Sequence, residues 1–393
     1  MELINQIKEL SENFHKEIIS IRRHIHQNPE LSFNEFETSE FICSKLDEYN
    51  VSYKNEYVKT GIIATIKGKN PDKKIIALRA DMDALPIIEE NEIPYKSVNK
   101  TMHACGHDAH TASLLGTAKI LNILKDKFEG TVKLIFQPGE ELLPGGALLM
   151  LDEGTLKDSE PDIVIGQHVL PTMKSGKAGF RKGMYMASSD EIYLTVSGKG
   201  GHAAITDKVT DTVLIASQII VALQQIVSRN AQASIPTVLS FGRVEANGAT
   251  NVIPNKVKID GTFRTMDEEW RKEAHLKIEK IAKSIAEGMG GKCEVKIVKG
   301  YPFLKNNELV TEQAKSFAEQ YLGKENVEDM EIRMTAEDFA YFAQKYPSTF
   351  YRLGTAGNNK ISHLHTSTFN IDENALCTGM GLMAWIAVSF LNK

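Results

Sequence analysis

The chain has 393 residues, of which 42% are apolar and 25% charged, and its formal net charge is −5 at pH 7. This composition is ordinary for a globular protein, and the acidic balance argues against a nucleic-acid partner. The length exceeds that of most single cores, so we expect two domains.

The N-terminal segment and the cysteines bear on the cellular compartment. Residues 1–27 are polar and amphipathic, without the apolar core of a secretory signal. The longest apolar-rich run, 212–227, contains polar residues and is shorter than the ~18 residues that a membrane span needs. We therefore expect a cytoplasmic protein with no membrane partner. Scattered cysteines without CxxC spacing fit that reducing compartment: Cys43, Cys105, Cys293 and Cys377.

Helical patterns alternate with short apolar runs from the N-terminus to about residue 183. The runs lie at 62–68, 74–81, 131–137 and 162–169, with a helix at about 108–125. β-Branched runs between helices predict strands buried on both faces of a largely parallel α/β sheet. The same rhythm resumes after about residue 301. It predicts a helix near 308–322, a strand at 349–355 and a last helix at 374–391.

The middle of the chain has a different order of elements. It predicts strands at 191–200, 237–246, 256–265 and 292–301, with helices at 211–230 and 267–290. The order β-α-β-β-α-β is typical of a ferredoxin-like α+β unit. We therefore expect a small domain, residues 185–300, inserted into a discontinuous α/β domain of residues 1–184 and 301–393.

Two motifs follow the predicted second strand. RADMDALP (79–86) carries Asp81 and Asp83, although a pair of aspartates also fits a solvated turn. MHACGHDAH (102–110) packs one cysteine and three histidines into a loop that enters a helix. Cys105 and His107 can both reach one metal or a pair of metals, the alternative being a buried cysteine among surface histidines. His103 and His110 are weaker candidates that fit a supporting role.

Further candidates follow the later strands. In QPGEE (137–141) one of two adjacent glutamates can bind a metal while the other handles a proton, although paired surface glutamates are common. His168 ends an apolar strand, where a histidine is more often a satisfied core residue. His363 and His365 lie in SHLHTSTFN. Ligands bind at the carboxyl ends of strands in open α/β sheets, so these segments predict one site.

The residue types of this site favour a pair of transition metals. One cysteine, three histidines and one carboxylate suit Zn²⁺, Mn²⁺, Co²⁺ or Ni²⁺. Five ligands exceed what one open tetrahedral site uses, which favours two ions that share a ligand. Such a pair activates a water for hydrolysis while a free glutamate takes its proton.

With these motifs the chain resembles the aminoacylase/carboxypeptidase family of dinuclear metallopeptidases, in its amidohydrolase branch. That branch includes hippurate hydrolase-like, indole-acetyl-amino-acid hydrolase-like and N-acetyl-diaminopimelate deacetylase-like enzymes. The resemblance spans nearly the whole chain. Besides the motifs above it rests on RRHIHQNPELSFNEFET (22–38), GKGGHAA (198–204), NVIPN (251–255) and GTFRT (261–265).

The resemblance implies a three-layer zinc-peptidase-like catalytic domain with a ferredoxin-like lid and dimerisation domain. It implies Glu140 as the general acid/base and Asp83 as a residue that orients the metal site. Cys105 is expected to bridge two divalent ions. The implied ligands are Cys105, His107, Glu141, His168 and His365.

The implied reaction is hydrolysis of the amide bond of small N-acyl amino acids. His202, Asn251 and Arg264 of the inserted domain are expected to bind substrate, the histidine from a partner in a homodimer or dimer of dimers. Purely structural alternatives to substrate binding are a turn at His202, a cap at Asn251 and a surface ion pair for Arg264. Two alternative functions are a carboxypeptidase or dipeptidase with the same site, and a non-enzymatic metal-binding scaffold.

Two positions depart from the family pattern. The wider family has H-x-D-x-x-P where this chain has D-x-D-x-x-P, so Asp81 stands in place of a histidine and has no assigned role. His107 is expected to supply the missing imidazole. Gly139 stands where the branch usually has alanine, a change that we expect to be neutral.

Overall fold

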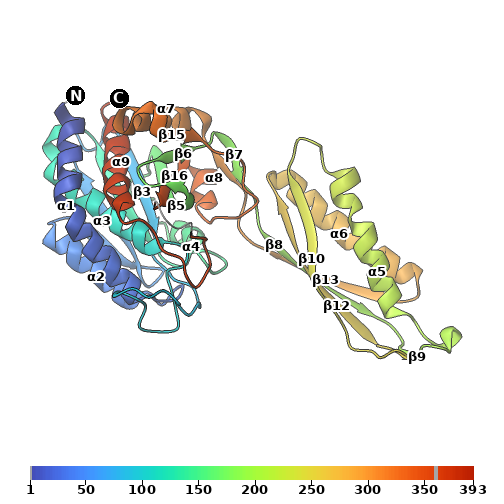
Figure 1. The fold of residues 1–393 in the computed structure, drawn as a ribbon. Helices are drawn as coiled ribbons and strands as arrows, with labels where there is room; N and C mark the ends of the chain where they lie inside the picture. The colour runs from blue at the N-terminus through green and yellow to red at the C-terminus, as the bar shows by residue number, and fades with distance from the viewer. Residues whose placement is uncertain (1, 358–361) are drawn as a thin grey trace. The chain divides into compact units, whose positions relative to one another are not determined.

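The computed structural model describes residues 2–357 and 362–393 and divides into two compact units (Figure 1). Each unit has its own buried apolar core. Two short strands, β7 (Gly183–Met186) and β14 (Leu304–Asn306), lie where the chain passes between the units. Unit 1 comprises Met1–Gly183, Lys305–Ile332 and Asp338–Lys393, and unit 2 comprises Met184–Leu304 and Arg333–Glu337.

Unit 1 is built on an eight-stranded sheet of order β1-β2-β4-β3-β5-β16-β6-β15. Four neighbouring central strands, β4, β3, β5 and β16, are parallel, whereas β1, β2 and β6 pair antiparallel to their inner neighbours. The carboxyl ends of the four parallel strands therefore meet at one edge. The strands are β1 (Ser52–Tyr57), β2 (Gly61–Lys67), β3 (Ile75–Asp81), β4 (Thr131–Gln137), β5 (Ile163–Lys174), β6 (Ala178–Phe180), β15 (Val327–Asp329) and β16 (Ser348–Ala356).

Helices cover both faces of this sheet, which gives three layers (Figure 1). α1, α3 and α9 pack against one another on one face, and α4 packs with α8 on the other. α9 is long and apolar enough to cross a membrane, but 72% of it is buried, as expected for a core helix. The helices are α1 (Glu2–Gln27), α2 (Phe36–Glu48), α3 (His107–Ile123), α4 (Gly146–Asp152), α7 (Glu308–Leu322), α8 (Ala340–Lys345) and α9 (Asn374–Leu391).

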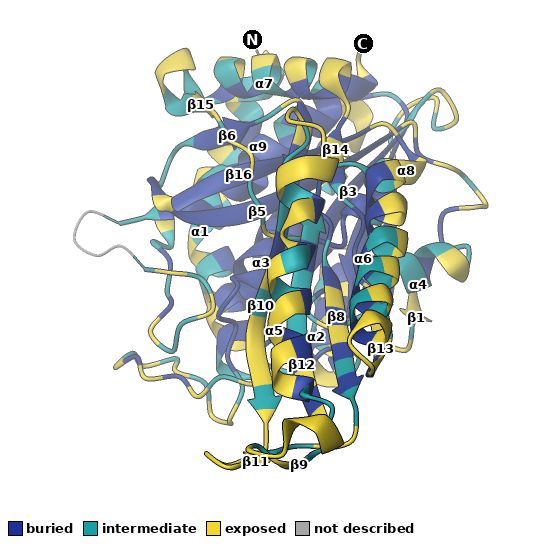
Figure 2. Ribbon diagram, turned by 90° about the vertical axis from the view of Figure 1, so that its right-hand side faces the viewer, coloured by how far each residue is buried: buried dark blue, intermediate teal, exposed yellow. Residues whose placement is uncertain are grey.

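Unit 2 is a four-stranded antiparallel sheet of order β10-β12-β8-β13 with α5 and α6 on one face. This is the strand order of the ferredoxin-like unit that the sequence predicts. Figure 2 shows both helices alternating between buried and exposed residues. The elements are β8 (Asp190–Ser197), β9 (Gly201–His202), α5 (Thr212–Leu223), β10 (Thr237–Ala246), β11 (Val252–Ile253), β12 (Lys256–Thr265), α6 (Glu268–Gly288) and β13 (Lys292–Lys299).

The structure departs from the predicted elements in two places. The sheet of unit 1 is parallel at its centre, as predicted, but strands β1, β2 and β6 pair antiparallel to their inner neighbours. The predicted helix 211–230 ends as α5 at Leu223 and continues only as a π-helical turn, Ile226–Asn230. Residues Thr212–Asn230 are long and apolar enough to cross a membrane, and 33% of the segment is buried.

Candidate metal centre

The predicted site lies at the carboxyl edge of the unit 1 sheet. Asp81 ends β3, Gln137 ends β4, and His168 lies in β5 beside them. His107 is the first residue of α3, and Gly106 before it has a φ of +87°. A Cβ atom on Gly106 would lie 2.6 Å from the side chain of Val169. Glycine therefore permits both the left-handed turn and the close approach of this loop to β5.

Cys105 stands at the centre of the predicted ligands. Its Sγ atom lies 3.5 Å from Nε2 of His168 and 3.4 Å from Nε2 of His365. The Nε2 atom of His365 is in turn 3.4 Å from Oε1 of Glu141. Glu141 Oε1 also lies 4.0 Å from Nε2 of His107. Residues from distant parts of the chain thus bring one sulfur, three imidazoles and a carboxylate together.

Two ligand groups share the cysteine. Cys105, His107 and His168 have potential ligand atoms within 4.8 Å of one another. So do Cys105, Glu141 and His365. This sharing is what a bridging thiolate between two cations requires.

The histidines present the nitrogens that a metal needs. Nδ1 of His107 donates to the backbone oxygen of Asp83 (2.9 Å), and Nδ1 of His168 donates to the oxygen of Val169 (2.8 Å). In the neutral imidazole each donation leaves the lone pair on Nε2. His107 Nε2 and Glu141 Oε1 are buried and have no hydrogen-bond partner among the described residues. Unpaired buried polar atoms that face a common point fit a metal site.

Electrostatics also favour a cation here. Burial raises the pKa of the Cys105 thiol, so a nearby positive charge is needed to hold it as a thiolate. Burial, and next the charge of Arg352, holds the pKa of His168 well below its usual value, which keeps its imidazole neutral. Cys105 and Glu141, which face the His365 ring, stabilise its positively charged form and raise its pKa to about 10.

Asp83 and Glu140 lie beside the ligands. Oδ2 of Asp83 accepts from Ser32 Oγ (2.5 Å) and from the backbone N–H of Glu141 (2.9 Å), while Oδ1 lies 3.2 Å from His107 Nδ1. Asp83 therefore orients one predicted ligand and the loop of another. Glu140 is 7% exposed, and its carboxylate joins His107 and Glu141 in a group of atoms within 4.8 Å.

The loop that carries Glu140 and Glu141 is held by Glu35, a residue for which the sequence predicted no role. Glu35 Oε1 accepts from the backbone N–H groups of Gly139 (2.8 Å) and Phe33 (2.9 Å), and Oε2 accepts from Thr60 (2.8 Å). Gly139 has a φ of +60°, and a Cβ atom there would lie 2.3 Å from the Phe33 ring. An alanine at this position would therefore strain the backbone and require the Phe33 ring to move. The difference between glycine and alanine at position 139 is thus not neutral in this structure, contrary to our expectation.

Other predicted residues have varied positions. His110 contacts Asp81, which also contacts Arg79, and His363 is exposed outside the ligand groups. His103 is buried, and neither ring nitrogen has a hydrogen-bond partner among the described residues. The sequence did not reveal four supporting residues, because each has a partner at least 51 residues away along the chain: Ser32, Glu35, Arg79 and Asp338.

The substrate-binding candidates of unit 2 lie at opposite ends of its sheet. His202 pairs with Val252, and the oxygen of Asn251 accepts from Ala203 at 2.9 Å, so these two candidates are neighbours. Arg264 is half-buried near the other end of β12, with Nε 3.1 Å from Thr262 Oγ1. About nine residues of strand separate that end from the β9–β11 pair, or roughly 30 Å. One small substrate cannot contact both groups within a single chain.

Comparison with known proteins places the chain in a family. The sequence profile of the peptidase family M20/M25/M40 matches residues 77–388. The chain is 39% identical over 380 residues to an N-acetylcysteine deacetylase of Bacillus subtilis (strain 168), covering 96% of this chain and 98% of the relative. It is 37% identical over 399 residues to thermostable carboxypeptidase 2 of Saccharolobus solfataricus, covering both completely.

A solved structure extends the likeness to three dimensions. The YXEP protein of Bacillus subtilis, a dinuclear metal binding peptidase from the M20 family, superposes with a TM-score of 0.82 at 35% identity. The match covers 97% of this chain and 99% of that one. The chain is therefore a metal-dependent hydrolase that belongs to the peptidase family M20/M25/M40.

Proposed function

We propose that the protein hydrolyses the amide bond of N-acyl amino acids with two divalent metal ions, releasing a free amino acid and a carboxylic acid. The observation that carries the proposal is the sharing of Cys105 by two groups of potential ligands. The named relative that removes acetyl groups from N-acetylcysteine supports the substrate class. The four cysteines are free, which fits the proposed cytoplasmic location.

Each ion has its own proposed set of ligands. Cys105, His107 and His168 would hold one ion, and Cys105, Glu141 and His365 would hold the other. Sulfur and imidazole favour Zn²⁺, Mn²⁺, Co²⁺ or Ni²⁺ over Mg²⁺ or Ca²⁺. When bound, such a pair polarises the scissile carbonyl and lowers the pKa of the attacking water.

Glu140 is the proposed general acid/base. Its carboxylate lies beside His107 and Glu141, where it can accept the proton of the attacking water and deliver it to the leaving nitrogen. Glu140→Gln keeps the shape of the side chain but cannot accept a proton. We expect kcat to fall by about 10²–10⁴-fold with two ions still bound per chain. Near-normal kcat, measured on the metal-loaded variant, would refute the role.

The substrate carboxylate is the proposed partner of Arg264. Burial lowers the pKa of this guanidinium, so pairing with an anion would be favourable. We propose that His202 and Asn251 contact the substrate bound to the other subunit of a homodimer, because they lie far from Arg264 within one chain. A KM increase with little change in kcat for Arg264→Lys would support the assignment.

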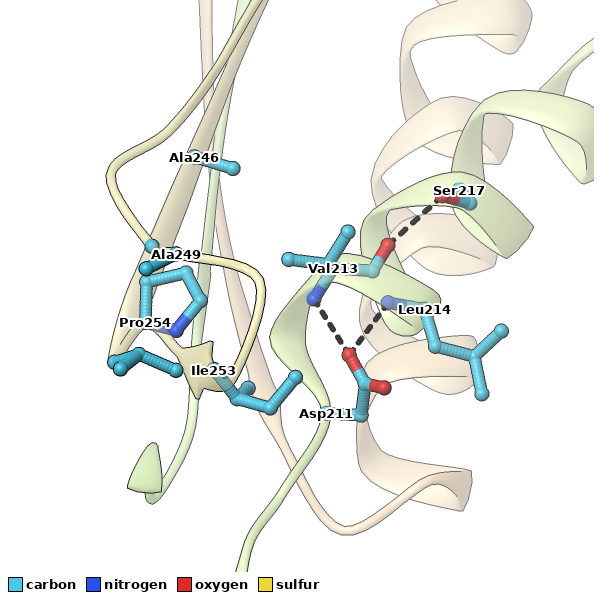
Figure 3. Close-up of a pocket in the computed structure, with 10 residues that line it drawn as sticks. Asp211, Val213, Leu214, Ser217, Ala246, Ala249, Ile253 and Pro254 are labelled. Atoms are coloured by element: carbon cyan, nitrogen blue, oxygen red, sulfur yellow. Dashed lines mark hydrogen bonds between the residues drawn. The ribbon is translucent and has the colours of Figure 1, made fainter. Parts of the chain in front are cut away.

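The proposed homodimer forms through unit 2. β10 is an edge strand whose Val244 is 53% exposed, and α5 beside it exposes Val221 by 69%. A hollow opens between the start of α5 and the chain around β11, lined by Val213, Leu214 and Ile253 (Figure 3). An unpaired strand edge next to apolar side chains is suited to pairing with a second copy.

A single charge tests this interface. Val221→Asp is expected to convert the dimer to a monomer, because a carboxylate would be buried without a partner. Leu276→Asp on α6 is the matched control, since Leu276 is equally exposed at 69%. Light scattering after size exclusion measures the mass. A wild-type monomer, or a Val221→Asp dimer, would contradict the proposed interface.

The second candidate function is a carboxypeptidase, favoured by the full-length likeness to thermostable carboxypeptidase 2. A panel of acetyl, benzoyl and indole-acyl amino acids against dipeptides separates the two activities by kcat/KM. We expect the acyl amino acids to be preferred. Preference for peptides by more than tenfold would establish the alternative, and inactivity on the whole panel with metals loaded would revive a scaffold role.

A further inference from the structure

A chain of hydrogen bonds runs beneath the predicted ligands of one ion. Arg79 Nη1 donates to Oδ2 of Asp81 at 2.6 Å, and Oδ1 of Asp81 lies 2.6 Å from Nδ1 of His110. On the far side of the ring, Nε2 of His110 lies 2.9 Å from the backbone nitrogen of Val169. The three side chains are at most 1% exposed. Their order is therefore Arg79, Asp81, His110 and then the backbone of β5.

The backbone N–H group of Val169 determines which atoms donate and which accept in this series of hydrogen bonds. The N–H group of Val169 can only donate, so Nε2 of His110 must accept and carries no proton. The proton of a neutral ring is then on Nδ1, where it is donated to Asp81. His110 thus joins a carboxylate to a backbone amide in a single tautomer.

Val169 connects these hydrogen bonds to His168, a predicted metal ligand. Its N–H group is bound by His110, and its carbonyl oxygen accepts from Nδ1 of His168 at 2.8 Å. The two peptide groups that flank Val169 are therefore each held by a histidine, the first by His110 and the second by His168, so His110 fixes the backbone against which His168 orients its ring. In metal sites, partners that orient a ligating histidine are worth about 10–100-fold in metal affinity.

Arg79, at the other end of this series of hydrogen bonds, is also held by several partners. Arg79 Nε donates to Gln137 Oε1 at 2.8 Å, and Nη2 donates to Asp338 Oδ1 at 2.7 Å. Asp338 also accepts from Gln137 and from the backbone of Ala147. Asp81 is thus paired with a buried cation that is tied to β4 and to the segment before α8.

Asp81, His107 and His110 also have polar atoms close enough together to hold an ion themselves. His110 could bind that ion only by giving up its bond to Val169 or its bond to Asp81. Oδ2 of Asp81 is paired with Arg79, whose charge opposes a second cation. These partners favour support over ligation.

Resting on the dinuclear centre proposed above, we propose that Asp81 and His110 are positioning residues for His168. They would selectively strengthen the metal position formed by Cys105, His107 and His168. The position formed with Glu141 and His365 has other supports. The backbone of Glu141 is bound by Asp83, and that of His365 by the oxygen of Ala104 at 2.8 Å.

Titration of the metal-free, full-length chain with Zn²⁺ by isothermal calorimetry tests the proposal. For His110→Ala we expect one of two binding steps to weaken by about 10–100-fold and the other to change by less than about threefold. His110→Gln can donate to Asp81 and accept from Val169, so it should restore part of the affinity. Ser113→Ala is the control that should leave both steps unchanged, because the buried Ser113 hydroxyl on the same helix has no hydrogen-bond partner among the described residues.

The outcomes separate the two proposals. Two ions bound by the wild type, with both steps unchanged or equally weakened in His110→Ala, would overturn the positioning role alone. Loss of one ion to the same degree in the alanine and glutamine variants would make His110 a ligand and also overturn it. A wild-type chain that binds fewer than two ions would refute the dinuclear centre itself. If the alanine variant does not fold, the glutamine variant must still show one selectively weakened step.

Discussion

The two units each bury a cluster of charged and imidazole side chains, and the clusters differ in how completely they are paired. In unit 2, Asp190 accepts from Arg271 Nε at 2.9 Å and from the backbone of Gly300 at 3.2 Å, and it lies 2.7 Å from His275 Nε2. Both of its oxygens are therefore occupied. In unit 1, His107 Nε2 and Glu141 Oε1 are buried and make no hydrogen bond among the described residues, and the ion-pair distance from Glu141 Oε1 to His365 Nε2 is 3.4 Å.

This difference separates a structural cluster from a candidate reaction centre. A buried group without a partner costs about 1–3 kcal/mol, and a cation bound between His107 Nε2 and Glu141 Oε1 would offset that cost for both atoms. The unit 2 cluster joins β8 to α6 and needs no ligand. The unit 1 cluster supplies a thiol and imidazole lone pairs that a cation would satisfy together.

The largest expected effect comes from removing the shared atom. Cys105→Ala deletes the sulfur between the two ligand groups, so we expect fewer than two ions per chain. The loss of the metals' electrostatic stabilisation, several kcal/mol, corresponds to a fall in kcat/KM of more than about 10³-fold. Elemental analysis and steady-state kinetics measure the two effects.

Cys293→Ala is the matched control for this prediction. Cys293 is also buried and free, but it packs among apolar residues of unit 2. We expect its replacement to leave the metal content unchanged. If Cys105→Ala still binds two ions per chain, the cysteine of unit 1 is not a metal ligand and does not differ in this respect from Cys293.

Most helices and strands could be predicted from the sequence. The candidate ligands could also be predicted to lie close together, because each candidate ligand follows the carboxyl end of a strand or begins a helix. The helix Glu308–Leu322 and the strands Thr237–Ala246 and Lys256–Thr265 agree with their predicted bounds. The sequence could not predict supports such as Glu35 and Arg79. Their partners Gly139 and Asp338 lie 104 and 259 residues away, where no local pattern links them.

Breaking the structural cluster should affect stability without affecting metal binding. Asp190→Asn removes a buried charge that is paired with Arg271 and His275, and we expect unit 2 to lose about 3–5 kcal/mol. Hydrogen exchange should speed up in β8 and α6. The metal content of unit 1 should stay the same, and its loss would show that the clusters are coupled.

Asp260→Asn is the surface control for that experiment. Asp260 pairs with Arg243 while its side chain stays 28% exposed and that of Arg243 63% exposed. An exposed pair of this kind contributes about 0–1 kcal/mol. Hydrogen exchange in unit 2 should therefore differ little from that of the unchanged chain.

The smallest expected effect concerns a support of the centre that carries its own charge. Burial, and next the charge of Asp83, raise the pKa of Glu35 to about 7, whereas a glutamate in an unfolded chain titrates near about 4.3. The folded chain therefore holds this proton more tightly than the unfolded chain. The resulting stabilisation is fully present below about pH 4.3 and is lost as the pH rises through about 7.

Glu35→Gln removes this dependence because glutamine stays uncharged. We expect the free energy of unfolding of the unchanged chain, relative to Glu35→Gln, to fall by about 1–3 kcal/mol between about pH 4 and pH 8. Urea denaturation of the metal-free proteins across that range measures the difference. Exposed Glu92→Gln is the control and should track the unchanged chain. If the difference stays flat or rises with pH, the three hydrogen bonds donated to Glu35 stabilise its carboxylate more than burial and the charge of Asp83 destabilise it. Glu35 would then be as fully paired as Asp190 of unit 2.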